Sequence, residues 1–198
     1  MIPAQLLNRY NAQLKSYEIG DFIFREQTKS HYYFQIVTGK VKLNNVSEDG
    51  KEFIQNIFQE NQSFGEAELF IDEVYPSNAM TLEKTEVLQV PKNDFFRLLQ
   101  ENPQYNKVIS ENISRRLYYK MLMSQQIFSQ HPAARITALM DYFKHIHSLN
   151  TKPVPYLIPL TRQQIANLTG LRVETVIRTV KKMEKEGVLK IINRQIFY

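Results

Sequence analysis

The chain has 198 residues, of which 23% are charged and 43% are hydrophobic, proportions typical of one large or two small globular domains. Cysteine is absent, which excludes disulfides, thiolate nucleophiles and cysteine-bound clusters, and no apolar run reaches the roughly 18 residues of a membrane span. The amino terminus lacks the basic and apolar segments of a secretory signal, so we expect a cytoplasmic protein with no membrane partner.

The charge is divided unevenly along the chain. Residues 1–101 carry 10 Lys and Arg against 15 Asp and Glu, whereas residues 102–198 carry 15 against 5. A basic second half, with a net charge of +10, predicts a polyanionic partner. The alternative is a solvated basic surface that binds nothing.

The first 91 residues begin with a short amphipathic pattern and continue with short strands. Apolar residues at Leu6, Leu7, Tyr10 and Leu14 predict a helix within residues 3–14. Alternating aromatic and β-branched runs follow, separated by turn residues and without a helical crossover pattern, so we expect a sandwich or barrel. The predicted strands cover residues 22–24, 32–37, 41–43, 53–58 and 87–90.

The periodicity becomes helical after Pro91. A helix at Asn93–Gln100 is followed by a long one, with Asn102 and Pro103 as its cap and first residue. About 25 helical residues extend about 37 Å, which is more than a domain of this size needs for its own core. We expect the long helix either to pair with a second copy of the chain or to act only as a spine within one chain. The residues predicted to contact the second copy are Ile109, Ile113, Leu117 and Met121.

The most informative segment runs from Thr161 to Gly187. Thr161 and Gln164 have the spacing of a capping box and predict the start of a helix. Ala166 is small enough for a second helix to cross closely, and Gly170 stands where the chain must turn. A second helix then ends at Gly187, and this spacing is that of a helix-turn-helix.

The exposed face of the second helix carries side chains that suit DNA. Arg178 can pair with guanine O6 and N7, and Glu174 can accept a hydrogen bond from cytosine N4. They are four residues apart and emerge on one face, although an ordinary surface ion pair is the alternative. We therefore predict double-stranded DNA as the partner, with base contacts from Arg172, Val173, Glu174 and Arg178. Phosphate contacts are predicted from Thr161, Arg162, Gln163, Thr175, Lys181 and Lys182.

The segments on either side of this motif complete the second half. A helix is predicted at Ala133–His147 and a proline-containing connector at residues 150–155. After the motif, Leu189–Ile192 and Gln195–Tyr198 are predicted as two strands of a hairpin, which makes the motif a winged helix. The Asn193-Arg194 turn lacks the Asn-Gly pair that tight hairpins favour, so its conformation is left open.

These residues together resemble the Crp/Fnr family of bacterial regulators over nearly the whole chain. The resemblance is most specific from Thr161 to Arg178, and the sequence Val173-Glu174-Thr175 with Arg178 is nearer the Fnr branch. A serine usual in that branch is Ile177 here. The resemblance implies an α+β fold with a double-stranded β-helix (jelly-roll) effector domain, a long dimerisation helix and a winged helix-turn-helix. The corresponding ranges are residues 1–101, 102–130 and 131–198.

The resemblance also implies a homodimer that binds a palindromic DNA site and contacts RNA polymerase. A cyclic-nucleotide cassette is recognisable, and it implies an effector pocket that includes Gly65, Glu66, Ser77 and Asn78. Where nucleotide-binding members have the arginine that pairs with the cyclic phosphate, this chain has Pro76, which offers neither charge nor N–H donor. We expect weak or no cyclic AMP binding and predict no cofactor. The pocket is expected either to take another small-molecule effector or to be filled by side chains such as Tyr75 and Met80.

Two other classes of function make different demands on the sequence. Metal-dependent enzymes with a double-stranded β-helix use clustered histidines, and the barrel segment contains only His31, so we predict no enzymatic activity. The second class is a small-molecule-binding or protein-interaction module whose helix-turn-helix has lost DNA binding. The salt dependence of DNA binding separates this class from a regulator.

Overall fold

A computed structural model describes residues 1–128, 131–147 and 155–198, and the chain forms two compact units, Met1–Ser114 and Arg115–Tyr198. The helix α4 (Gln104–Phe128) contributes residues to both units. Within these described ranges no helix is both long enough and apolar enough to cross a membrane.

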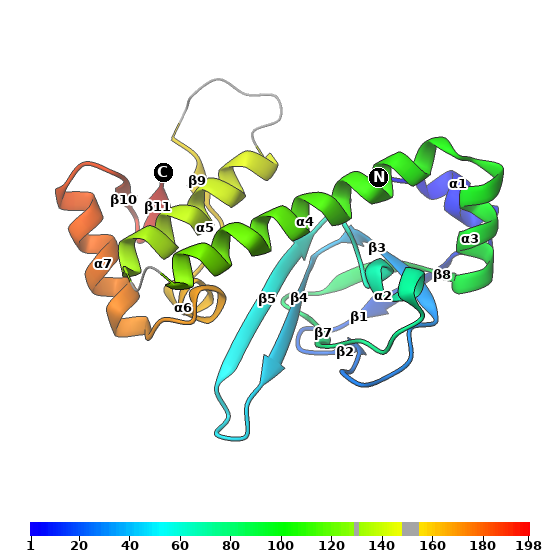
Figure 1. Cartoon of the computed structure of the whole chain (residues 1–198), viewed down its shortest axis with the longest axis horizontal. Coiled ribbons are helices and arrows are strands. Elements are labelled where there is room, and N and C mark those ends of the chain that lie inside the picture. Colours follow the sequence, from blue (N-terminus) through cyan, green and yellow to red (C-terminus); the bar gives the residue numbers. More distant parts are fainter. Residues whose placement is uncertain (129–130, 148–154) are drawn as a thin grey trace. The chain divides into compact units, whose positions relative to one another are not determined.

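The first unit is built on two four-stranded antiparallel sheets (Figure 1). Strand alternation explains the fold, because every second side chain of a strand faces the same side of its sheet. In β5, for example, Ile54, Asn56 and Phe58 are buried and their neighbours are more exposed. One sheet has the order β1 (Gln13–Tyr17), β8 (Thr85–Pro91), β3 (Tyr32–Thr38) and β6 (Ser63–Phe64). The other has the order β2 (Phe22–Phe24), β7 (Asn78–Thr81), β4 (Lys40–Val46) and β5 (Glu52–Gln59).

Short helices complete this unit. The helices α1 (Ala4–Asn8) and α3 (Lys92–Glu101) lie at the same end of it, as Figure 1 shows. They form one hydrophobic cluster with β3, β8 and the start of α4, in which the Tyr33 and Phe95 rings stack at 4.4 Å. A third helix, α2 (Glu66–Ile71), follows β6 after one residue, Gly65.

The amino-terminal helix is shorter than its sequence pattern predicts. It ends at Asn8, and Leu14, predicted on its apolar face, instead lies 54% exposed in β1. Asn11 adopts a positive φ of 58°, which interrupts the helix, and β1 then pairs along its length with β8. The backbone hydrogen bonds of a distant strand therefore override the local helical pattern.

Asn102 also has a role that differs from the prediction. Its side-chain amide donates hydrogen bonds to the Leu98 carbonyl and to the Tyr10 hydroxyl, both at 3.0 Å. These contacts close the end of α3, and α4 begins two residues later, at Gln104. Asn102 therefore closes α3, and its carbonyl also accepts a hydrogen bond from the Tyr105 N–H at 3.1 Å, at the start of α4.

The second unit packs helices on a small sheet. Its core includes Ile136, Leu139, Ile165 and Val176, and the Tyr119 and Tyr142 rings stack at 3.6 Å. The predicted connector lies outside the described residues except for Pro155. The helices are the end of α4, α5 (Pro132–His147), α6 (Arg162–Thr169) and α7 (Val173–Lys185), and the antiparallel strands, in order, are β10 (Lys190–Ile192), β11 (Gln195–Phe197) and β9 (Leu157–Ile158).

The expected fold class is confirmed: a β-sandwich precedes a long helix and a helix-turn-helix with a hairpin. The predicted domain limits at residues 101 and 130 treat α4 as a separate segment, whereas the compact units divide within it, after Ser114.

Candidate DNA-binding surface and effector cassette

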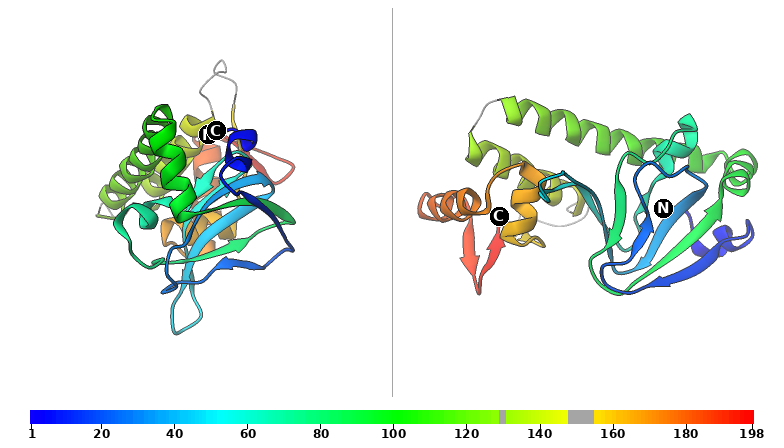
Figure 2. Two further views of the ribbon diagram at one scale, coloured as in Figure 1. Left: turned by 90° about the vertical axis from the view of Figure 1, so that its right-hand side faces the viewer. Right: turned by 90° about the horizontal axis from the view of Figure 1, so that it is seen from below.

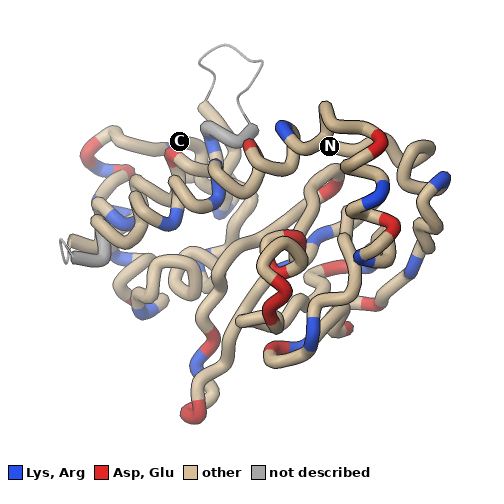
Figure 3. Tube along the Cα trace, turned by 45° about the vertical axis from the view of Figure 1, so that its right-hand side comes forward, with Lys and Arg blue, Asp and Glu red and all other residues tan. Residues whose placement is uncertain are grey.

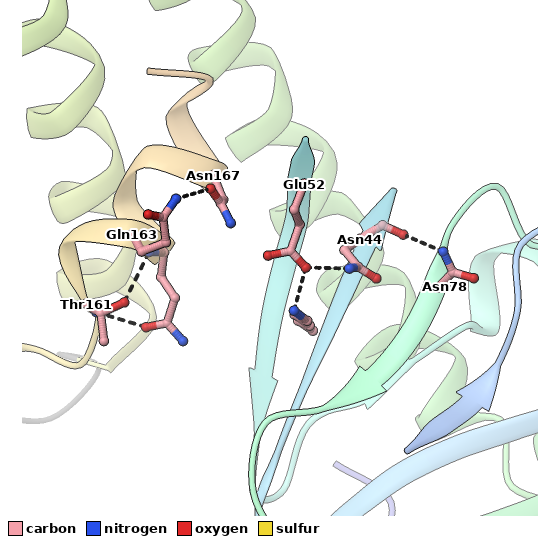
Figure 4. Close-up of polar contacts among 8 residues, drawn as sticks. Asn44, Glu52, Asn78, Thr161, Gln163 and Asn167 are labelled. Carbon is pink, nitrogen blue, oxygen red and sulfur yellow. Dashed lines mark hydrogen bonds and ion pairs between the residues drawn. The ribbon is translucent and has the colours of Figure 1, made fainter. Parts of the chain in front are cut away.

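The helix α6 begins with the predicted capping box. The Thr161 hydroxyl accepts a hydrogen bond from the Gln164 backbone N–H at 3.1 Å, and the Gln164 side-chain oxygen accepts one from the Thr161 N–H at 2.8 Å (Figure 4). Two backbone donors at the helix start are thereby satisfied.

A left-handed residue makes the corner between α6 and α7. Gly170 has φ 67° and ψ 19°, and the following Leu171 N–H donates to the Ala166 carbonyl at 3.1 Å. No atom lies within 4 Å of where a Gly170 side chain would begin, so the backbone conformation and not lack of space favours glycine here. Ala166 is 1% exposed, as expected for the small residue of the crossing. The predicted helix-turn-helix is confirmed by this geometry.

The helix α7 presents a buried apolar face and a charged outer face. Val176, Val180 and Met183 are buried in the second unit. Its end is fixed by hydrogen bonds from the Gly187 N–H to the Glu184 carbonyl and from the Val188 N–H to the Met183 carbonyl. The exposed residues on the other face include Arg172, Glu174, Arg178, Lys181 and Lys182, whereas Val173 and Thr175 are half-buried.

Two of the four predicted base-reading side chains, Glu174 and Arg178, are exposed on α7. Within the described part of the chain, neither Glu174 nor Arg178 forms a salt bridge, so the surface ion pair considered from the sequence is not present. Lys182, in contrast, lies 3.7 Å from a Glu186 carboxylate oxygen on the same helix. Figure 3 shows Lys and Arg positions along the helices of this unit.

The residues predicted to contact phosphates differ in their surroundings. Thr161 and Gln163 are exposed, and Gln163 donates to the Asn167 side-chain oxygen at 2.8 Å (Figure 4). Arg162 is half-buried and donates to the Arg194 carbonyl at 3.1 Å, and burial lowers the pKa of its guanidinium. Asn167 was not among the predicted phosphate contacts. It lies four residues after Gln163 and therefore on the same face of the helix.

The hairpin stands beside α7 in both Figure 1 and the right-hand view of Figure 2. Its two-residue turn has positive φ at both Asn193 (49°) and Arg194 (65°), which is the type I′ pattern of tight hairpins. The sequence does not predict this conformation, because no glycine follows Asn193. The Arg162 contact to the Arg194 carbonyl holds the tip against α6. The hairpin also pairs with β9 through Ile196 and Ile158, a third strand that was not predicted.

The four cassette residues of the first unit are all buried. Glu66 is fully buried and accepts a hydrogen bond from the Ser63 hydroxyl at 2.8 Å. Asn78 accepts from the Glu26 backbone N–H at 3.2 Å and donates to the Asn44 carbonyl at 3.3 Å (Figure 4). Gly65 and Ser77 are also enclosed.

Aromatic rings fill the interior beside this cassette. The Phe24 and Tyr75 rings stack at 3.6 Å with an angle of 11° between their planes. A Cβ atom on Gly65 would lie 3.2 Å from both rings. Burial raises the pKa of the Tyr75 hydroxyl well above its usual range. The nearby His31 and Tyr32 backbone amides lower this pKa by a smaller amount. The hydroxyl is neutral, and its proton has no acceptor among the described residues.

Pro76, which stands where the resemblance implies an arginine in nucleotide-binding members, directly follows Tyr75 of this aromatic pair. It is exposed, and its carbonyl accepts a hydrogen bond from the Asn45 side-chain amide at 2.8 Å. The side chain itself supplies no donor to an anion.

The four residues predicted at the dimer contact of α4 fall into two groups, one packed against the first unit and one exposed. Ile109 is 1% exposed and belongs to the hydrophobic cluster of the first unit, against which Ile113 also packs. Leu117 and Met121 are 59% and 58% exposed. Tyr118, which was not predicted, is 65% exposed. An apolar surface therefore remains on the later part of α4.

The geometry defines a protein with a β-sandwich effector-type unit and a winged helix-turn-helix unit. The cyclic nucleotide-binding domain family matches residues 14–102, and the Crp-like helix-turn-helix domain family matches residues 135–197. With a cyclic nucleotide-binding-type domain followed by a Crp-like helix-turn-helix domain, the chain has the domain composition of the Crp/Fnr-type transcription regulators to which it is similar.

The similar proteins include regulators of different kinds. The cAMP-activated global transcriptional regulator CRP of Haemophilus influenzae is 29% identical over 83% of this chain and 73% of its own length. The transcriptional activator protein anr of Pseudomonas aeruginosa is 23% identical over 89% and 72%. The structure of FixK2 from Bradyrhizobium japonicum has a TM-score of 0.77 and 20% identity, and covers 94% of this chain and 91% of that one. The structural likeness supports the fold.

Proposed function

We propose that the chain is a sequence-specific regulator that binds double-stranded DNA through α7. The observation that carries the proposal is the Gly170 corner, from which α7 projects Glu174 and Arg178, exposed and without salt-bridge partners in the described structure. Helix-turn-helix proteins place such residues in the major groove, where a carboxylate and a guanidinium discriminate bases. Arg172 and Val173 complete the proposed base-reading set. We also propose, from the residues between Val173 and Arg178, that the chain is nearer the Fnr branch.

We further propose that the protein acts as a homodimer on a palindromic site. The support is the exposed apolar surface of α4 formed by Leu117, Tyr118 and Met121. Two recognition helices would contact half-sites about 34–36 Å apart. Family resemblance adds cytoplasmic location and contact with RNA polymerase to this proposal.

The salt dependence of the affinity for DNA tests whether the helix-turn-helix binds DNA or has lost that activity. A helix-turn-helix that neutralises about six phosphates gives a slope of about −5 for log affinity against log salt. Fluorescence polarisation with a labelled duplex over a salt series measures this slope. A flat response would favour a module that binds a small molecule or a protein and no longer binds DNA.

For the effector unit we propose that cyclic AMP is not bound. The residues do not fit a cyclic nucleotide: Pro76 gives its phosphate no donor, Glu66 is buried with Ser63, and the Phe24–Tyr75 pair packs against Gly65. This packing favours an interior filled by side chains over a second small-molecule effector. Mass spectrometry of any small molecule that co-purifies with the chain would distinguish the two.

Calorimetric titration with cyclic AMP is expected to show weak binding at most, with no saturation at micromolar ligand. Losing the charge-assisted contact to the phosphate removes about 1.5–3 kcal/mol, and the aromatic pair adds a steric obstacle. Pro76→Arg is a matched control, because it restores the charge and leaves the aromatic pair in place. The affinity of this variant for cyclic AMP is expected to remain weak. Micromolar affinity of the unmodified protein would contradict the proposal.

A further inference from the structure

Ile177 is an apolar residue on the charged face of the recognition helix. Its side chain is 41% exposed, whereas Val176, Val180 and Met183 are buried. In α7, all of which the structure describes, it is the one large hydrophobic side chain that is exposed. Because 41% of its surface stays exposed, packing within the second unit uses only part of this apolar side chain.

The helical spacing places Ile177 within the proposed base-reading surface. It follows Glu174 by three residues and directly precedes Arg178. At about 100° per residue, Ile177 and Arg178 lie about 60° and 40° to opposite sides of Glu174 around the helix axis. All three side chains therefore face the same groove when α7 is docked for Glu174 and Arg178 to contact bases.

The chemistry of the groove identifies what such a side chain can contact. The thymine 5-methyl is the apolar group that base pairs present in the major groove. Isoleucine offers no hydrogen bond, so covering the amino or carbonyl edge of a base would leave that polar group unpaired.

We infer that Ile177 contacts a thymine methyl beside the base pair read by Glu174 and Arg178, and so selects an A·T pair there. This inference rests on the proposed function, because it requires α7 to enter the major groove. It adds a specificity-determining residue and a chemical group on the DNA that this residue recognises.

Deoxyuridine substitution tests the contact, because it deletes only the methyl group. A preferred duplex is first obtained by selection from random DNA, and each half-site thymine is then replaced singly with deoxyuridine. Binding is measured by fluorescence polarisation for the unmodified chain, Ile177→Ala and Lys182→Ala. Ile177→Ala should fold normally, because the side chain is exposed and alanine favours helix. Circular dichroism checks this.

The expected result has three parts. At one thymine next to the Arg178-dependent base pair, deoxyuridine should weaken binding of the unmodified chain about fourfold, the equivalent of one buried methyl. Ile177→Ala should bind the thymine duplex several-fold more weakly and lose the response to deoxyuridine. Lys182→Ala should bind every duplex more weakly and keep the fourfold response.

Two outcomes would overturn the inference alone. Either no half-site thymine responds to deoxyuridine, or Ile177→Ala responds as strongly as the unmodified chain, so that another residue contacts the methyl. A protein that enriches no duplex from random DNA would overturn the proposed function as well, which distinguishes the two failures.

Discussion

Arg178→Ala is expected to lower affinity for the preferred duplex by about 1–3 kcal/mol per half-site and to remove the preference at one base pair. The reason is that the guanidinium is exposed on α7 without a salt bridge in the described structure, so its hydrogen-bonding capacity is available to guanine. The measurement is competitive binding with duplexes in which each half-site base pair is changed in turn.

Lys182→Ala is the matched control for this change. Lys182 lies on the same helix and is also exposed, but it is assigned to phosphate, which carries no sequence information. Its removal should weaken all duplexes alike and reduce the salt slope by about one per half-site. If both variants lost affinity with the same unchanged sequence preference, base recognition by Arg178 would be wrong.

Leu117→Glu is expected to dissociate the homodimer and to lower DNA affinity by about 10²–10⁴-fold. Leu117 is 59% exposed in the isolated chain, and a carboxylate buried there between two copies would lack a partner. The loss in DNA binding follows because two linked half-site contacts multiply the effective affinity. Sedimentation and polarisation assays on the same samples measure both effects.

Ile19→Glu provides the control, because Ile19 is also an exposed aliphatic residue, at 72%, but lies before β2 and away from α4 in the sequence. It should leave both sedimentation and DNA affinity unchanged. A Leu117→Glu protein that still sedimented as a dimer would remove this surface of α4 as the interface.

The winged helix-turn-helix was predictable because its determinants are local. The Thr161–Gln164 capping box spans four residues, and the Gly170 corner depends on one backbone conformation. The apolar spacing of Val176, Val180 and Met183 defines the buried face of α7 directly. The helical period then predicts that Glu174 and Arg178 lie on the exposed face of α7.

The features that were missed depend on residues far apart in the chain. Leu14 lies in a strand because β8, more than seventy residues later, offers its hydrogen bonds. Ile109 looked available for a dimer, but it is enclosed by α1 and α3 side chains that its own periodicity does not reveal. The short strands β6, β7 and β9 have too few residues to show an alternating pattern.

The effector cassette was partly predictable. The sequence identified Gly65, Glu66, Ser77 and Asn78 by resemblance, and Pro76 by the missing charge. It could only suggest that Tyr75 fills the interior. The stacking of Tyr75 on Phe24, 51 positions earlier in the chain, required the three-dimensional structure.

Selection of bound duplexes from random DNA in dilute salt tests the central claim most directly. The account predicts enrichment of a palindrome with a G·C pair in each half-site and half-sites centred about 10–10.5 base pairs apart. If the purified protein enriched no sequence over bulk DNA, the proposed use of α7 would be contradicted.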